Sequence, residues 1–158
     1  MKKIRNPWIP LTDKGYNCFA CAPSNPYGLK MEFHEEGDEI VSLWTPDDNF
    51  QGWLNTLHGG IQATLLDEIG GWLIARKFQT SGMTTNLNVK YRKPIPTGKD
   101  ITIEVRARVK EVKRMFVFIE AEIRHDGEIR SSAEMTYYTF PKDVAEKDFM
   151  FTGCELEE

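Results

Sequence analysis

The residues best able to do chemistry lie in one short stretch that reads LHGGIQATLLDE, from Leu57 to Glu68. His58-Gly59-Gly60 stands where an irregular loop enters a predicted helix. The first turn of a helix presents unpaired backbone N–H groups and the positive end of the helix dipole. Because glycines let a ligand approach the backbone closely, the Gly59 and Gly60 amides could polarise a carbonyl group or hold an oxyanion. The simpler interpretation is a tight turn from loop to helix.

Asp67 is the second candidate, because it lies on a helical face made of small or apolar residues. At 100° per residue its neighbours on the helix surface are Ala63, Thr64, Gly70, Gly71 and Ile74. A carboxylate in such surroundings is costly unless it has a partner or a task, and the glycines leave room for a substrate. Alternatively, the glycines only let the helix approach a sheet while Asp67 reaches a hydrogen bond. Glu68 points about 100° away, nearer the stripe of Leu65 and Trp72, so we prefer Asp67.

The surrounding pattern predicts the elements that must position these residues. Residues 29–34 and 40–45 alternate with a period of two and predict a hairpin, whereas 61–78 has a helical period and is apolar on most sides. Four further strands are predicted at 86–92, 101–109, 116–123 and 129–140. With no second strong helix to bury the first, we expect an α+β fold in which an antiparallel sheet wraps around one long central helix. Its exposed edges predict a homodimer.

The chain divides into an irregular N-terminal arm (1–28), this domain (29–141) and an acidic tail (142–158) that we expect to be partly disordered. Its 158 residues, 41% hydrophobic and 28% charged, are typical of one globular domain. A net charge of −4 argues against nucleic acid as a partner. The longest apolar stretch is too short to span a membrane, and the first residues, MKKIRNPWIP, do not form a signal peptide, so we expect a cytoplasmic protein.

At this point the sequence resembles a known family, the hotdog-fold thioesterases, and within it the PaaI-like branch. The resemblance runs from about Cys18 to Phe140. It rests on HGGIQATLLDE, on NLNVKYRKPIPTG, and on an opening, NCFACAPSNPYGLKMEF, similar to a Cys-Phe-x-Cys…Asn-Pro-x-Gly-Leu pattern found in some members.

The resemblance implies hydrolysis of acyl-CoA thioesters without metal or organic cofactor. By position, Gly59 would donate its N–H to the thioester carbonyl, and His58 would support that loop and the substrate. Asp67 would act as general base or nucleophile, and Thr84 would orient the water. In this family the Asp and the His-Gly-Gly loop come from different subunits, which implies a homodimer, possibly paired into a tetramer. The predicted substrate-binding set, which draws on the residue patterns as well as on the resemblance, is Gly60, Gln51, Glu68, Thr85, Arg92 and Arg114.

One departure concerns the position six residues before the histidine, where many relatives carry Asn or Gln. Here it is Gly52, with Gln51 beside it. Either Gln51 takes the role through a shifted loop, or the role is vacant. A non-catalytic acyl-CoA-binding or sensing protein therefore stays open as the alternative to an enzyme. A dehydratase of 3-hydroxyacyl thioesters is a third hypothesis, which hydration of an enoyl-CoA would test.

Two weaker signals concern metals and phosphates. Cys18-x-x-Cys21 has the spacing of half a zinc site, but a second ligand pair is missing, so the sequence predicts no metal. Basic clusters around Arg92 and Arg114 could hold the phosphates of coenzyme A or could be ordinary solvated strand ends.

Overall fold

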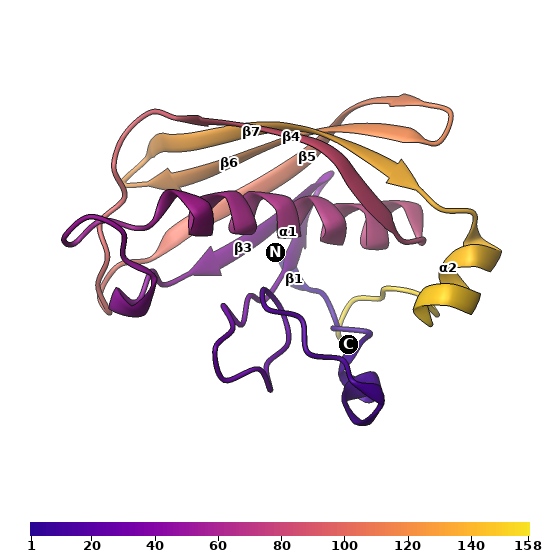
Figure 1. Cartoon of the computed structure of the whole chain (residues 1–158). Helices are drawn as coiled ribbons and strands as arrows, with labels where there is room; N and C mark the ends of the chain where they lie inside the picture. The colour runs from indigo at the N-terminus through magenta and orange to yellow at the C-terminus, as the bar shows by residue number, and fades with distance from the viewer.

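A computed structural model describes the whole chain, residues 1–158, and confirms the predicted α+β class. Seven strands form one antiparallel sheet in the order β1-β2-β3-β5-β6-β7-β4. The strands are β1 (Lys2–Lys3), β2 (His34–Glu36), β3 (Glu39–Trp44), β4 (Gly82–Tyr91), β5 (Ile103–Lys113), β6 (Phe116–His125) and β7 (Glu128–Thr139). The sheet curls over one long helix, α1 (Gly59–Phe78), as Figure 1 shows.

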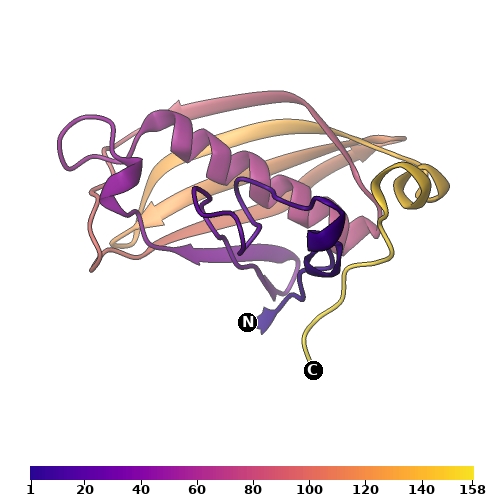
Figure 2. The same ribbon diagram turned by 60° about the horizontal axis from the view of Figure 1, so that its bottom comes forward.

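The central helix is covered on both sides. Its sheet-facing side packs against β3 to β7, and the approach is close: a Cβ on Gly70 would lie 2.3 Å from the Met135 sulfur of β7. On its other side, Trp72 stacks on Phe33 at 4.3 Å between ring centroids and meets Trp8 edge-on at 5.3 Å. The N-terminal arm therefore lies across the helix, opposite the sheet (Figure 2). This explains why α1 is apolar on most of its surface.

Residues 29–33 differ from the predicted strand. Leu29, Met31 and Phe33 are buried in alternation, as expected, but β2 begins only at His34. The backbone partners of this segment are loop carbonyls of Phe19 and Ala20 rather than a strand. Lys30 also has a φ of 54°, a left-handed conformation that interrupts an extended chain.

The C-terminal segment also differs from the expected partly disordered tail. It begins with a short helix, α2 (Lys142–Phe149), and continues with buried Phe151 and Cys154. The Cys154 carbonyl accepts hydrogen bonds from Arg76 and Gln79, and Leu156 forms a β-bridge with Ile4. Two short 3-10 helices, η1 (Ile9–Lys14) and η2 (Asp48–Phe50), complete the fold. None of the helices is both long and apolar enough to cross a membrane.

Candidate active site

The start of α1 leaves one backbone donor free. His58 caps the helix: its Nδ1 accepts a hydrogen bond from the Gly60 N–H at 2.9 Å. The Ile61 and Gln62 amides both bond to the His58 carbonyl. The Gly59 N–H alone in this turn has no acceptor within the chain. The Tyr91 hydroxyl donates to the Gly59 carbonyl at 2.7 Å and fixes the turn from the side of β4.

This geometry corrects one prediction, because the Gly60 amide is occupied by the His58 side chain and is not available to a ligand. Since His58 Nδ1 is the acceptor, a neutral His58 carries its proton on Nε2, on the exposed side of the ring. Of the two predicted amides, only that of Gly59 is free to bind a ligand, and it lies at the positive end of the helix dipole.

The loop before the helix packs tightly on the cap. A Cβ on Gly52 would lie 3.2 Å from the His58 Cα, so this position favours a residue without a side chain. The Gln51 side-chain oxygen accepts from the Asn55 amide at 2.8 Å and closes the loop on itself. Trp53 is 87% exposed, and it lines an open depression of about 470 Å³ together with Gln51 and His58. The next residue, Leu54, is 80% exposed, so two adjacent large apolar side chains stand open to solvent near the free Gly59 donor.

Asp67 lies further along α1 and is oriented from β4. The Thr84 hydroxyl donates to Asp67 Oδ1 at 2.7 Å, and this is the only hydrogen bond that the carboxylate accepts from another side chain. Asp67 Oδ2 accepts no hydrogen bond within the chain. Tyr137 stands nearby with its pKa raised by burial and by the charges of Asp67 and Glu68, so it remains a neutral phenol.

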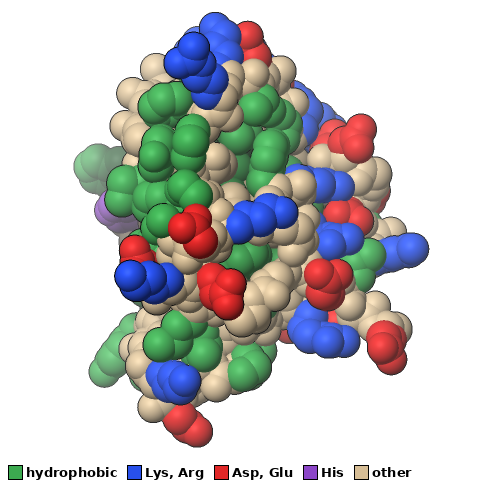
Figure 3. All heavy atoms as spheres, turned by 90° about the vertical axis from the view of Figure 1, so that its right-hand side faces the viewer, with side chains coloured by type: hydrophobic (Ala, Val, Ile, Leu, Met, Phe, Trp, Pro, Cys, Tyr) green, Lys and Arg blue, Asp and Glu red, His purple; other side chains and the backbone are tan.

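Part of the space expected beside Asp67 is present. Met135 fills the position next to Gly70, but Gly71 lines a mainly apolar cavity of about 290 Å³. Other lining residues include Tyr137 and Phe149 of α2. On the face that carries α2, hydrophobic side chains gather between charged ones (Figure 3). Apolar space therefore begins one helical turn from Asp67.

Glu68, predicted to bind substrate, lines the same 290 Å³ cavity as Gly71. It turns toward the N-terminal arm, where it accepts hydrogen bonds from Trp72 Nε1 at 3.1 Å and from the Cys18 thiol at 3.7 Å. Burial raises the pKa of Glu68 to about 7. The hydrogen bond between the two cysteines lowers the pKa of the Cys18 thiol to about 5 and raises that of Cys21.

The remaining predicted residues are spread over the sheet. The Thr85 hydroxyl bonds to the Thr136 carbonyl of β7 at an irregularity in the ladder and so supports the sheet. Arg92 and Arg114 lie near opposite ends of β7. The Arg92 amide bonds to the Arg130 carbonyl, near the start of the strand. Arg114 lies in the turn before Phe116, which pairs with Tyr138 near the end of the strand. Residues 130 and 138 are about 26 Å apart along a strand. One chain therefore cannot bring Arg92 and Arg114 to the same phosphates.

Sequence reasoning missed Tyr91, which holds the Gly59 carbonyl. Its place in a period-two strand indicated only an exposed or half-buried aromatic, and no spacing rule connects it with a helix that begins 32 residues earlier.

The two candidate groups are too far apart to act together within one chain. Gly59 and Asp67 are eight residues apart on a straight helix, or about 12 Å along its axis. A carbonyl group held by the one and a water activated by the other must lie within about 3 Å of each other to react.

Known proteins resemble this chain in sequence and in fold. A family model described as "Thioesterase superfamily" matches residues 54–131, which include all of α1. Acyl-coenzyme A thioesterase THEM4 of Xenopus laevis is 32% identical over 98 residues, or 61% of this chain and 42% of that protein. THEM4 of Rattus norvegicus is 25% identical over 113 residues, or 72% and 48% of the two chains. The chain thus spans less than half the length of these relatives.

Solved structures share the fold. Zebra fish thioesterase superfamily member 2 superposes with a TM-score of 0.66 and 19% identity, covering 84% of this chain and 98% of that one. A Streptococcus mutans protein solved with acetyl-CoA bound gives a TM-score of 0.64 at 18% identity, covering 71% and 90%. Residues 54–131, and with them the helix that carries Gly59 and Asp67, are therefore similar in sequence to the thioesterase superfamily, and the chain shares the hotdog fold of the solved thioesterase structures.

Proposed function

We propose that this protein hydrolyses acyl-CoA thioesters and belongs to the PaaI-like branch. The observation that carries the proposal is the pair of groups on α1: a free Gly59 N–H at the helix start and an Asp67 carboxylate oriented by Thr84. A backbone donor at a helix N-terminus and a positioned carboxylate are the two elements that acyl transfer requires. The THEM4 relatives, named acyl-coenzyme A thioesterases, and the acetyl-CoA bound to the Streptococcus mutans neighbour support the choice of substrate.

The reaction follows from these groups. The Gly59 N–H donates to the thioester carbonyl oxygen and stabilises the negative charge that develops there. Asp67 accepts a proton from water as the water oxygen attacks the carbonyl carbon. The tetrahedral intermediate then expels the thiolate of coenzyme A, which takes up the proton, and leaves the free acid. The cavity beside Gly71 offers apolar space for an acyl group one turn from Asp67.

The separation of Gly59 and Asp67 requires a second copy of the chain. Each site then combines Gly59 of one subunit with Asp67 of the partner subunit. β4 provides the surface, because it is a ten-residue strand at the edge of the sheet with no strand on its outer side. A long unpaired edge strand invites pairing, whereas the opposite edge, β1, has only two residues.

The register of such a pairing is constrained by the contacts of β4 with α1. Thr84 meets Asp67 and Tyr91 meets Gly59, so the two ends of β4 mark the two half-sites. Antiparallel pairing about a two-fold axis between residues 87 and 88 places Thr84 of one copy opposite the partner subunit's Tyr91. The Asp67 of one copy and the Gly59 of the other then approach each other on both sides of the axis.

Charges on the free edge of β4 are expected to abolish the dimer and the activity together. Asn86 and Asn88 are exposed on this strand, and the double change to Glu places four carboxylates close to the proposed two-fold axis. Light scattering during gel filtration should then give one 18.2 kDa chain in place of a pair, with CoA release lost. The matched Asn86→Gln/Asn88→Gln variant keeps the dimer. An active monomer would exclude a shared site.

Thr84→Val is expected to lower kcat by about tenfold or more, since a hydrogen bond to a charged group contributes about 1.5–3 kcal/mol. Valine keeps the shape of threonine but removes the hydroxyl that orients Asp67. Thr84→Ser retains that hydroxyl and should retain most of the activity. Steady-state CoA release by both variants checks this, and equal kcat values would show that Thr84 does not position Asp67.

The proposed reaction itself is tested by free-thiol release from a panel of acyl-CoAs with short, long and aromatic acyl groups. Turnover of at least one substrate supports the proposal, and the preferred acyl group defines the substrate class. Tight binding without release from any substrate would instead identify a non-catalytic acyl-CoA-binding protein.

A further inference from the structure

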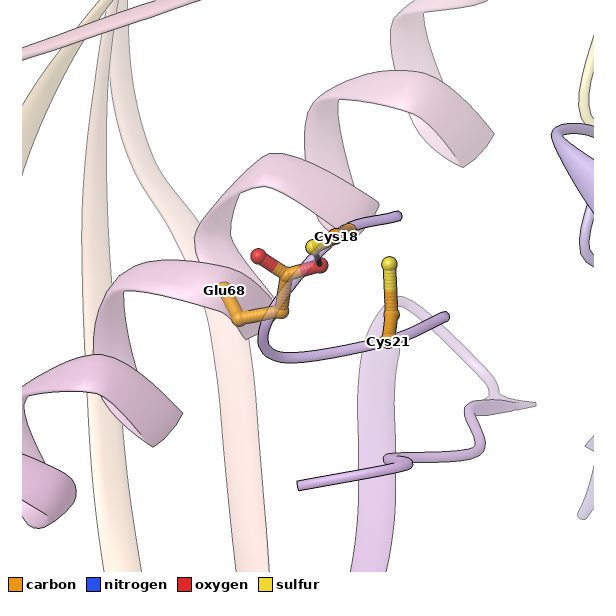
Figure 4. A group of neighbouring side chains, drawn as sticks. All are labelled: Cys18, Cys21 and Glu68. Atoms are coloured by element: carbon orange, nitrogen blue, oxygen red, sulfur yellow. Dashed lines mark hydrogen bonds between the residues drawn. The ribbon is translucent and has the colours of Figure 1, made fainter. Parts of the chain in front are cut away.

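A cluster of metal-binding side chains lies on the opposite side of α1 from the sheet. It consists of Cys18 and Cys21 from the N-terminal arm and Glu68 from α1, whose ligand atoms all lie within 4.8 Å of one another. Figure 4 shows the two cysteines on one loop and the carboxylate on the neighbouring helix. The spacing of the cysteines alone predicted no metal site, because the third donor is 50 residues away in the chain.

The distances fit a tetrahedral ion. A zinc ion bonds to sulfur at about 2.3 Å and to carboxylate oxygen at about 2.1 Å, so neighbouring S and O ligands are about 3.6 Å apart. The observed distance from Cys18 Sγ to Glu68 Oε1 is 3.7 Å. The loop is held in shape by its own backbone, since the Ala22 amide bonds to the Cys18 carbonyl at 3.0 Å.

A second layer of hydrogen bonds orients the donors, as is usual around metal ligands. Trp72 Nε1 donates to Glu68 Oε1 at 3.1 Å. The Tyr16 hydroxyl lies 3.0 Å from Cys21 Sγ and is itself held by Asn6 at 3.0 Å.

The cluster contains no cationic side chain. Two thiols and a carboxylate lie together in a half-buried to buried position, and none of the ion pairs in the structure includes Glu68. The half-buried Glu35 and the buried Glu122, by contrast, are paired with Arg or Lys. The 290 Å³ cavity reaches both cysteines and Glu68 and gives an ion a way in.

We propose that Cys18, Cys21 and Glu68 bind one Zn²⁺ ion, with the fourth position taken by a water molecule from the cavity. Two thiolates and one carboxylate are a borderline-soft donor set that suits zinc better than Mg²⁺ or Ca²⁺. The bound ion would fasten the N-terminal arm to α1 one residue after Asp67. The ion would lie at the wall of the cavity proposed for the acyl group, but it takes no part in the proposed hydrolysis.

The test uses the full-length, metal-stripped, reduced protein under oxygen-free conditions. Zn²⁺ is titrated against a chromogenic chelator, and Co²⁺ is bound in a parallel sample to record thiolate-to-metal absorption in the near ultraviolet. We expect one Zn²⁺ per chain and a strong cobalt–thiolate band. Cys18→Ser should weaken Zn²⁺ affinity by at least about a hundredfold. Loss of a residue that only hydrogen-bonds to a ligand already costs up to about a hundredfold, and Cys18 would be a ligand itself.

Matched variants separate the site from general effects. Cys154→Ser removes a buried thiol outside the cluster and should bind Zn²⁺ like the wild type. Glu68→Gln preserves the shape and the Trp72 contact and should weaken binding while both cysteines still give the cobalt band. The absence of stoichiometric Zn²⁺ binding by the wild type, a cobalt complex without thiolate absorption, or equal affinity of the Cys18→Ser variant would each overturn the proposal.

Discussion

Asp67→Asn is expected to lower kcat for the proposed acyl-CoA hydrolysis by at least about a hundredfold, because it removes the proposed general base. Asparagine has the size of aspartate and can still accept the hydrogen bond that Thr84 donates to Asp67 Oδ1. The fold, the dimer and the thermal stability should therefore be unchanged. Steady-state release of CoA from the best substrate measures the effect.

An Asp-to-Asn change at an exposed position outside the site is the control for this variant. Asp38 is exposed in the turn between β2 and β3, so Asp38→Asn alters the net charge equally without touching α1. It should leave kcat at the wild-type value. Asp67→Asn kinetics equal to those of the Asp38→Asn control would remove Asp67 from the mechanism, whatever the activity of the wild type.

Gly59→Pro is the second large effect, with an expected loss of about 10²–10³ in kcat, the usual consequence of losing one oxyanion donor. Proline has no backbone N–H, so the change deletes the one free donor at the start of α1. The position tolerates it: Gly59 is the first residue of the helix, where proline is favoured. The preceding residue, His58, already has φ −59° and ψ 134°, the extended conformation that proline requires before it.

The control for this variant is Gly59→Ala, which keeps the N–H and adds only a Cβ. That atom would lie 3.4 Å from the nearest ring carbon of Tyr91, close to ordinary contact. We expect Gly59→Ala to retain most of the wild-type kcat. Circular dichroism and thermal melting should show that both variants fold. If the proline and alanine variants had similar kcat values, the amide would have no part in polarising the carbonyl.

Most helices and strands could be predicted from the spacing of apolar residues alone. The predictions that were wrong have local structural causes. The helical pattern predicted α1 from residue 61, but the helix begins at Gly59 because the His58 side chain caps it, a contact that no pattern reveals. Residues 29–33 alternate like a strand, yet the left-handed Lys30 and their loop partners prevent regular pairing. α2 was missed because its eight polar-rich residues bury only Ala145 within the helix.

The sequence could indicate the individual candidate residues of the site, but not the contacts that they make in the folded chain. Glycines at a helix start and a carboxylate on a small-residue face indicated Gly59 and Asp67 directly. The sequence could not show which of the two glycine amides is free. The His58 ring turns toward the Gly60 N–H and accepts its hydrogen bond, so only the Gly59 N–H stays free. The sequence could not show that the packing of the N-terminal arm brings Cys18 and Cys21 to Glu68, because these residues are far apart in the chain.

The most direct test of the central claim, a thioesterase site shared between two subunits, is CoA release by a mixture of the Asp67→Asn and Gly59→Pro proteins after their subunits have exchanged. Each variant alone lacks one group in both sites and should be nearly inactive. Random mixing makes half of the dimers mixed, and each mixed dimer combines an intact Gly59 with an intact Asp67 at one of its two sites. The account predicts that about a quarter of the wild-type activity returns. If wild-type protein hydrolyses acyl-CoA but the exchanged mixture stays as inactive as its components, Gly59 and Asp67 do not act together across the dimer, and the account is wrong.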